Sequence, residues 1–281
     1  MSGGQTKVAV VGHVEWVMFA RVEQMPRGGE IAHAYDTFEE PAGGGAVVAV
    51  QLARLAGGCV LFTALGDDDV GHRSVERLRE LGVDVRATFS AQPTRRAVTL
   101  VDDAGERTIT TFGPRLEPLA DDHPGQREAL AGHDAIYFTA GGAGALLAAR
   151  DASDVVVASP RAREAIGHGV HLDALVLSGD DEMECREAAR VEGEAELVVW
   201  TEGSRGGRYQ DGAAMGGWDA PPLSSEPIDS YGCGDSFAGG VTYALGAGYQ
   251  VPKALALAAR CGAECLTGRG PYERQLSSAD L

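Results

Sequence analysis

A cluster of glycines and two carboxylates precedes an apolar segment near the end of the chain, in the stretch DSYGCGDSFAGG at residues 229–240. Apolar residues at helical spacing follow Asp235, so a helix is predicted to begin close to that residue. Consecutive glycines let backbone N–H groups converge at a helix start, where the helix dipole also favours an anion. A carboxylate there would be suited to accept the proton of a hydroxyl that attacks a phosphoryl group. The spacing alone equally allows Asp235 to be a structural cap.

The composition excludes several other classes of protein. The chain has 281 residues, of which 44% are hydrophobic and 23% charged, as in an ordinary globular protein. Its formal net charge of −17 argues against binding to nucleic acid or to an anionic membrane. Phosphate ligands stay possible, because backbone N–H groups bind anions without basic side chains. With no membrane-length apolar run, no secretory leader pattern and five cysteines without a C-x-x-C pair, we expect a cytoplasmic protein with reduced thiols.

Hydrophobic periodicity predicts the strands and helices that must position residues 229–240. Short apolar segments rich in β-branched residues alternate with helical patterns along most of the chain. The predicted strands are 7–12, 59–66, 134–141, 154–160, 173–179 and 196–203, and helical patterns cover 45–57 and 70–82. This alternation predicts a single α/β domain over residues 1–281, with a mostly parallel sheet between two helical layers.

Two segments depart from the alternation. Residues 97–112 are predicted to form two strands joined by the turn DDAGE, and residues 30–44 read as a strand or two before the first long helix. We therefore expect a small β lid, built from about 14–42 and 94–113. The free edges of such a lid favour pairing with a second copy, so a homodimer is expected.

Four motifs, in order, resemble those of the ribokinase-like (PfkB) carbohydrate kinase family. DSYGCGDSFAGG is similar to the family signature D-T-x-G-A-G-D-x-F, with Ser230 and Cys233 as departures. The other three are EPAGGGAVVAVQLARLAG at 40–57, TALGDDDVGHRSVERLRELGVDV at 63–85 and TEGSRGG at 201–207. The resemblance covers essentially the whole chain. It implies a three-layer α/β/α ribokinase-like fold and an ATP-dependent phosphotransferase acting on a hydroxyl of a sugar, sugar derivative or nucleoside.

The resemblance also implies roles for particular residues. Asp235 matches the catalytic base, and the anion hole matches Gly232, Cys233 and Gly234. The loop near the nucleotide phosphates matches Thr201, Gly203 and Gly206. A non-catalytic, ligand-binding member of the same fold is the alternative.

Mg²⁺ bound with ATP is the cofactor that the resemblance implies. The family's N-x-x-E motif has its counterpart in Asp181 and Glu184, which we expect in an outer shell of the ion, with Glu182 as an alternative. A solvated acidic helix start is the competing interpretation. Asp229 and Tyr231 fall where some family members bind a monovalent cation, so K⁺ is a further candidate.

The acceptor end departs from the family pattern. Val17 stands where sugar kinases of the family carry an Asp, and Val47 stands at the Asn of the glycine-rich signature. We expect Glu15 to replace the missing Asp, beside Gly43 and Gly44 of that signature. Trp16 and Val47 would then give the pocket an apolar wall, favouring a nucleoside or modified sugar. The competing interpretation makes Glu15 a solvated residue at a strand end, and Trp16 with Phe19 part of the lid or core packing.

Arginines on the predicted hairpin suggest a second kind of acceptor. The three residues in question are Arg95, Arg96 and Arg107. Phosphosugar kinases of the family hold the substrate phosphate with basic lid residues, and the planar guanidinium suits a phosphate. The alternative is that these arginines are solvated or ion-paired.

Overall fold

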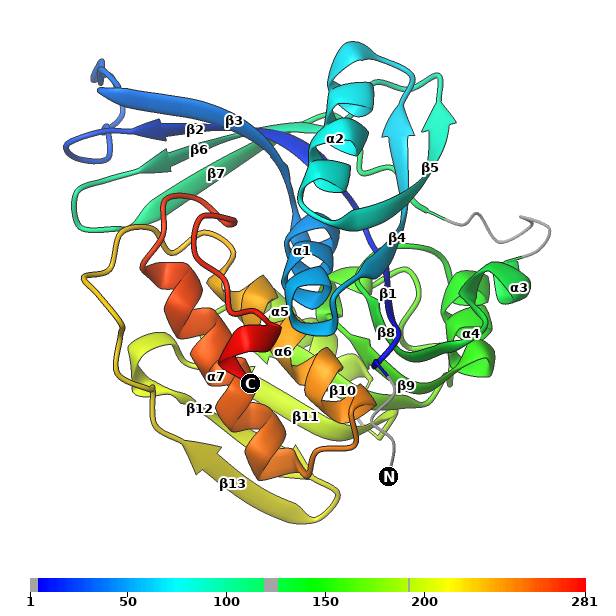
Figure 1. Cartoon of the computed structure of the whole chain (residues 1–281). Helices are drawn as coiled ribbons and strands as arrows, with labels where there is room; N and C mark the ends of the chain where they lie inside the picture. The colour runs from blue at the N-terminus through cyan, green and yellow to red at the C-terminus, as the bar shows by residue number, and fades with distance from the viewer. Residues whose placement is uncertain (1–4, 119–125, 192) are drawn as a thin grey trace.

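A nine-stranded sheet forms the centre of the computed structural model, which describes residues 5–118, 126–191 and 193–281 (Figure 1). Its strand order is β13-β12-β11-β10-β9-β8-β1-β4-β5. The strands are β1 (Val8–Val11), β4 (Cys59–Gly66), β5 (Val83–Ser90), β8 (His133–Phe138), β9 (Ser153–Ala158), β10 (Leu172–Ser178), β11 (Ala195–Thr201), β12 (Gly207–Asp211) and β13 (Ala214–Trp218). Pairing is parallel from β5 to β11 and antiparallel for β12 and β13.

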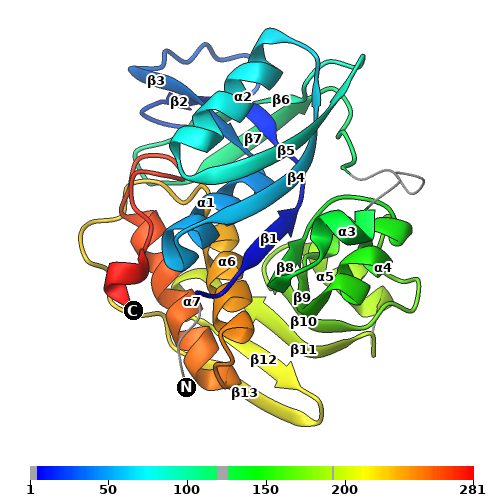
Figure 2. The same ribbon diagram turned by 45° about the vertical axis from the view of Figure 1, so that its right-hand side comes forward.

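Helices cover both faces of this sheet, which explains why its central strands are continuously apolar. One layer holds α1 (Gly44–Ala56), α2 (Asp69–Glu80), α6 (Cys233–Gly246) and α7 (Val251–Leu266). The other holds α3 (Gln126–Leu130), α4 (Ala143–Ala152) and α5 (Glu182–Arg190). Figure 2 shows the two layers on opposite sides of the strands. The predicted three-layer, mostly parallel α/β architecture is confirmed.

A second sheet of four strands projects from one end of the main sheet (Figure 1). Its order is β3-β2-β6-β7, with β2 (Glu15–Arg21), β3 (Asp36–Ala42), β6 (Arg96–Val101) and β7 (Arg107–Phe112). Only residues 12–14 separate β1 from β2, so the chain passes directly from the carboxyl end of a central strand into this sheet. Strand β7 lies at its edge and is exposed along its whole length.

Several elements were not predicted from the sequence. Strand β5 alternates buried and exposed residues after α2, and the hairpin of β12 and β13 contains glycines at positions 207, 212, 216 and 217. Alternation and glycine both weaken the apolar signal on which the strand predictions rested. Among the described residues, no helix is both long and apolar enough to cross a membrane.

Candidate active site

The carboxyl ends of the central strands, the start of α6 and the inner side of β7 enclose a cavity of about 200 Å³. In open parallel sheets this is the edge where ligands bind. Most of the residues singled out from the sequence line it. They are Glu15, Gly43, Gly44, Arg107, Glu184, Thr201, Tyr231, Gly232, Gly234 and Asp235.

The turn before α6 has the geometry of an anion site. Gly232 is the N-cap at φ 84°, a left-handed conformation, and a β-carbon there would lie 2.9 Å from Pro271 Cβ. The first helical bond, 2.8 Å long, runs from the Ser236 N–H to the Gly232 carbonyl. The N–H groups of Gly234 and Asp235 precede that bond, so the helix ladder does not use them. The Cys233 N–H makes a long 3.4 Å contact with the Ser230 carbonyl.

Asp235 lies in the first turn of α6 and faces the cavity. Its pKa is raised to about 6, chiefly because burial disfavours the charged carboxylate. The positive charges of Arg161 and Arg107 oppose that rise, and the negative charge of Glu184 adds to it. A carboxyl with this pKa is ionised at neutral pH yet still basic enough to take a proton.

Glu15 is buried at the start of β2 and lines the same cavity. Its Oε2 atom lies 3.2 Å from Arg95 Nε, at ion-pair distance. Burial raises the pKa of Glu15, Arg95 lowers it, and the charge of Asp235 raises it further. The negative charge of Asp235 therefore acts on Glu15 across the cavity.

A glycine turn separates these two carboxylates. At Gly43, which has φ 87°, a β-carbon would lie 3.3 Å from Glu15 Cγ. At Gly44 it would lie 3.2 Å from Asp235 Oδ1. The Gly43 N–H donates to the Tyr231 hydroxyl at 3.3 Å, which ties the turn to the start of α6. Glycine at both positions keeps the space between the carboxylates open.

Two arginines, one on strand β7 of the second sheet and one after the central strand β9, bring positive charge to the cavity. Arg107, on β7, donates from Nη1 to the carbonyl and hydroxyl of Ser230, at 3.1 and 2.7 Å. Arg161 follows β9, and its Nη2 lies 2.6 Å from Glu184 Oε1. Glu184 therefore already neutralises Arg161, whereas the hydrogen-bond partner described for Arg107 is uncharged.

The carboxylates predicted to lie near metal ions have protein partners. Asp181 caps α5, its Oδ1 accepting from the N–H groups of Met183 and Glu184. Glu184 accepts from the Ser178 N–H at 2.8 Å and pairs with Arg161. Asp229 is buried and accepts from the N–H groups of Tyr231 and Gly270, at 2.9 and 3.2 Å.

Some residues expected at the site lie elsewhere. Trp16 points to the far side of β2, where its ring contacts Arg73 and its Nε1 donates to Glu39. Val47 packs beneath Gly232, 3.1 Å from the position of a β-carbon there. The expectation that Trp16 and Val47 form an apolar pocket wall is therefore wrong.

The other displaced residues play structural roles. Phe19 stacks on Phe38, and Val17 is buried in the core. Arg96 is exposed, and its charge acts on Asp68. Gly206, at φ 87°, lies against the Trp218 carbonyl, and Gly203 faces open space, so of the T-x-G-x-x-G loop residues only Thr201 lines the cavity.

Several residues at or beside the site were missed from the sequence, and three of them carry polar side chains that bear on its charge. His13 and Arg161 line the cavity, and Arg115 donates to the Arg161 carbonyl at 2.8 Å. His13 and Arg161 each follow a central strand at its carboxyl end. The rule that ligands bind at this edge of a parallel sheet could have identified both.

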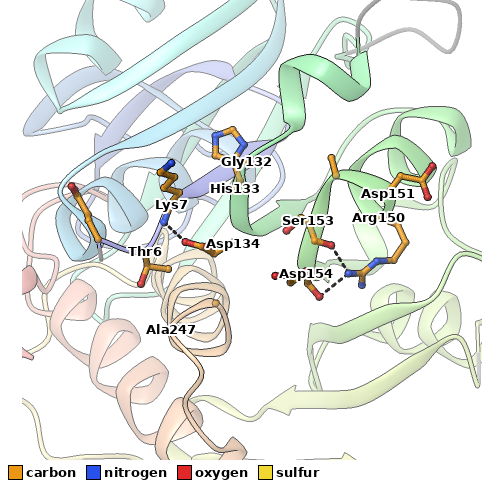
Figure 3. Close-up of a pocket in the computed structure, with 13 residues that line it drawn as sticks. Thr6, Lys7, Gly132, His133, Asp134, Arg150, Asp151, Ser153, Asp154 and Ala247 are labelled. Carbon is orange, nitrogen blue, oxygen red and sulfur yellow. Dashed lines mark hydrogen bonds between the residues drawn. The ribbon is translucent and has the colours of Figure 1, made fainter. Parts of the chain in front are cut away.

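A larger hollow of about 860 Å³ lies at the opposite, amino ends of β1, β8 and β9 (Figure 3). Its polar groups bind one another: the Lys7 N–H donates to Asp134, and Arg150 donates to the carbonyls of Ser153 and Asp154. These groups therefore have protein partners, and among the described residues that line the hollow no carboxylate lies in the first turn of a helix.

The three-layer body, the second sheet at the carboxyl ends of its strands, and the aspartate beside a glycine turn together define a ribokinase-like kinase. The chain belongs to the PfkB family: the model of the pfkB family carbohydrate kinases matches residues 5–175 and 169–277. It is therefore a PfkB-type carbohydrate or nucleoside kinase, as the four sequence motifs predicted.

The individual relatives have low sequence identity to this chain. The ATP-dependent ribose-1-phosphate kinase of Halopiger xanaduensis is 26% identical, over 98% of this chain and 96% of its own length. The aminoimidazole riboside kinase of Salmonella typhimurium is 27% identical, over 85% and 87%. Among solved structures, ribokinase from Thermotoga maritima aligns with a TM-score of 0.79 at 20% identity, covering 98% of this chain and 97% of that one. Ribokinase from Cryptococcus neoformans, in complex with ADP, aligns at 0.77 and 21%, covering 98% of both chains.

Proposed function

We propose that this kinase transfers the γ-phosphoryl group of ATP to a hydroxyl of a phosphorylated pentose. The observation that carries the proposal is the cavity itself. It brings together a basic carboxylate at a helix start, a second carboxylate for sugar hydroxyls, and an arginine whose described partner is neutral. The likeness to the relative named as a ribose-1-phosphate kinase supports the same class of acceptor.

In this proposal Asp235 accepts the proton of the acceptor hydroxyl as its oxygen attacks the γ-phosphorus. The bond from that phosphorus to the bridging oxygen of ADP breaks in the same in-line transfer. The free N–H groups of Gly234 and Asp235 then face the charge on the transferring group. Because the Cys233 N–H already contacts Ser230, we assign the anion hole mainly to these two N–H groups.

The cavity volume supports a small, polar acceptor. About 200 Å³ lies below the roughly 300–1,000 Å³ that is usual for pockets binding larger ligands. With Trp16 and Val47 outside the cavity, the reason for preferring a nucleoside is lost. Glu15 offers two carboxylate oxygens, which can accept hydrogen bonds from neighbouring sugar hydroxyls.

We assign the acceptor phosphate to Arg107. Its Nη1 atom is held by Ser230, which leaves the other donors of the fork for an anion. Arg95 and Arg161 are less suited, since Glu15 and Glu184 already neutralise them. Arg107 lies on the exposed edge strand β7, so it can approach a ligand from above the cavity.

The residues present fit Mg²⁺ in an outer shell better than in direct contact. Asp181 and Glu184 already accept protein hydrogen bonds, and Mg²⁺ keeps several of its waters when it binds with nucleotide phosphates. The ion would neutralise charge on the transferring phosphates. Thr201 and the loop that follows it remain the residues that we propose bind the nucleotide.

Asp229, buried between two N–H donors, fits a K⁺ ion nearby, and a K⁺ titration of activity would test this.

The central test is the variant Asp235→Asn. It should fold, bind ATP, and lose about 10²–10⁴-fold in turnover, because general-base catalysis contributes that much. Binding of ATP by calorimetry separates the loss of the base from loss of the site. Near-wild-type turnover in the variant would overturn the assignment. A parent enzyme without turnover on any sugar, nucleoside or sugar phosphate would instead favour the non-catalytic alternative.

The acceptor class is tested with ribose 1-phosphate and free ribose as a pair. Arg107→Ala should raise KM for ribose 1-phosphate much more than KM for ribose, and leave KM for ATP nearly unchanged. Arg96→Ala is the matched control, since Arg96 lies on the neighbouring strand but outside the cavity. Equal effects on both acceptors would argue against phosphate recognition by Arg107.

The exposed edge strand β7 could pair with a second copy of the chain, so we also propose a homodimer, which light scattering would test.

A further inference from the structure

His13 is fixed at the point where two segments of the chain cross. A β-carbon at Gly12 would lie 2.6 Å from Gly45 Cα, and one at Gly45 would lie 2.6 Å from the His13 carbonyl oxygen. The Gly45 N–H donates to that carbonyl at 3.1 Å. Only glycines allow so close a crossing, so the backbone of His13 has little freedom to move.

The imidazole of His13 borders the space between Glu15 and Asp235. A β-carbon at Gly43 would lie 3.2 Å from His13 Nε2, and one at Gly44 would lie 3.6 Å from His13 Cε1. The same position at Gly44 is 3.2 Å from Asp235 Oδ1. His13 and Asp235 therefore flank one small open volume, which is where the reacting hydroxyl must lie if Asp235 is the base.

One ring nitrogen of His13 has no described hydrogen-bond partner in the protein. Among the described residues, the buried Nδ1 atom of His13 has no hydrogen-bond partner. Buried polar atoms are nearly always paired, so an unpaired one on a ring that lines a cavity points to a ligand partner. A half turn of the ring exchanges Nδ1 with Cδ2 and Nε2 with Cε1, which turns nitrogen toward the ligand without moving the backbone.

The ring also stays uncharged. Burial lowers the pKa of His13 to about 3, and the positive charges of Arg115, Arg95 and Arg161 add to that effect. A neutral imidazole does not compete with the arginines for a phosphate. It offers one donor and one acceptor, which matches a hydroxyl.

We propose that His13 binds a sugar hydroxyl next to the reacting one, and so selects hydroxylated over deoxy acceptors. The inference rests on the proposed function, because it takes Asp235 as the base. Glu15 would hold the acceptor from the other side of Gly43. The pair can therefore distinguish a diol from a deoxy sugar, since a site built for a hydroxyl rejects a ligand that lacks it.

The experiment compares ribose 1-phosphate with its 2-deoxy and 3-deoxy analogues, because the hydroxyl next to the reacting one is carried by C2 or C3 whichever free hydroxyl reacts. For the parent enzyme, kcat/KM should favour the ribose compound. His13→Ala should reduce this preference about tenfold, the size expected for one hydrogen bond, mainly through KM for the ribose compound. His13→Gln, whose amide also donates and accepts, should restore part of it. His168→Ala is the control, because His168 is exposed and outside the cavity.

The outcomes separate this inference from the proposed function. An equal loss on all three acceptors in His13→Ala would overturn the role of His13, because a merely structural contribution affects all of them alike. Binding of each acceptor without ATP, measured by calorimetry, should show the same change in preference. If the parent enzyme phosphorylates none of these compounds, nor any other sugar or nucleoside, the proposed function fails first.

Discussion

Gly44 lies so close to Asp235 that a β-carbon at position 44 would be 3.2 Å from the Asp235 Oδ1 atom. It would also be 3.5 Å from Thr139 Oγ1. The absent side chain therefore leaves open the space through which an acceptor hydroxyl must reach the carboxylate. Gly44 is also the first residue of α1, where alanine is otherwise a better helix former than glycine.

Gly44→Ala should separate activity from stability. We expect kcat/KM to fall by about tenfold or more, since a misplaced reacting group is costly in rate. The melting temperature should stay the same or rise. Gly58→Ala is the control, because a β-carbon at Gly58 meets nothing within 4 Å. Unchanged kinetics in Gly44→Ala would mean that the acceptor does not pass this point.

The pH profile should report the raised pKa of Asp235. A base must be deprotonated, so kcat/KM should fall as the pH drops below about 6 and reach a plateau above it. Arg161 is the largest influence that lowers this pKa, so Arg161→Ala should move the acidic limb to higher pH, whatever its effect on the maximal rate. The pKa of Glu15 is raised as well, so Glu15 can contribute to the fall of kcat/KM at low pH. The pH profile of Glu15→Gln measures that contribution. A limb that stays in place in Arg161→Ala would contradict the assignment to Asp235.

Glu15 and Trp16 show how far the sequence could predict the site. Successive residues of a strand point to opposite faces, so a carboxylate that enters the cavity sends its neighbour away from it. The sequence analysis predicted a lid over about 14–42 but no strand beginning at Glu15, so this alternation was not used and Trp16 was expected beside Glu15. Val47 is a different case, because its place beneath Gly232 depends on how α1 packs against α6, which no local pattern reveals.

The parts predicted best were those with strong local signals. Buried parallel strands are continuous apolar runs, and the glycine turn at Asp235 is contiguous in sequence. The arginine beside Glu184 was missed, because Arg161 and Glu184 are brought together only by the packing of α5 near the end of β9. Charge pairs between distant segments leave no periodic trace in the chain.

The net charge of −17 predicts that salt stabilises the fold. Repulsion among excess carboxylates opposes the compact state, and added ions screen it. The melting temperature should rise as NaCl, chosen because it adds no K⁺, increases from about 0.01 M to about 1 M, while the Debye length falls from about 30 Å to about 3 Å. A neutral osmolyte at matched osmolality controls for solvent effects. A melting temperature that falls with NaCl would show that attractive ion pairs dominate instead.

The requirement for Mg²⁺ should depend on the carboxylates at the start of α5. Replacing both, in Asp181→Asn with Glu184→Gln, should raise the Mg²⁺ concentration needed for half-maximal activity without abolishing ATP binding. The physical reason is that outer-shell carboxylates hold the waters of the ion by charge-assisted hydrogen bonds. Glu182→Gln is the matched control, because Glu182 is on the same helical turn but exposed and paired with Arg186. Since Glu184 is buried and neutralises Arg161, the melting temperature of each variant must be measured alongside. An unchanged Mg²⁺ titration in a folded double variant would show that neither residue belongs to the metal site. An equal shift in Glu182→Gln would show that the Mg²⁺ requirement depends on the acidic cluster as a whole.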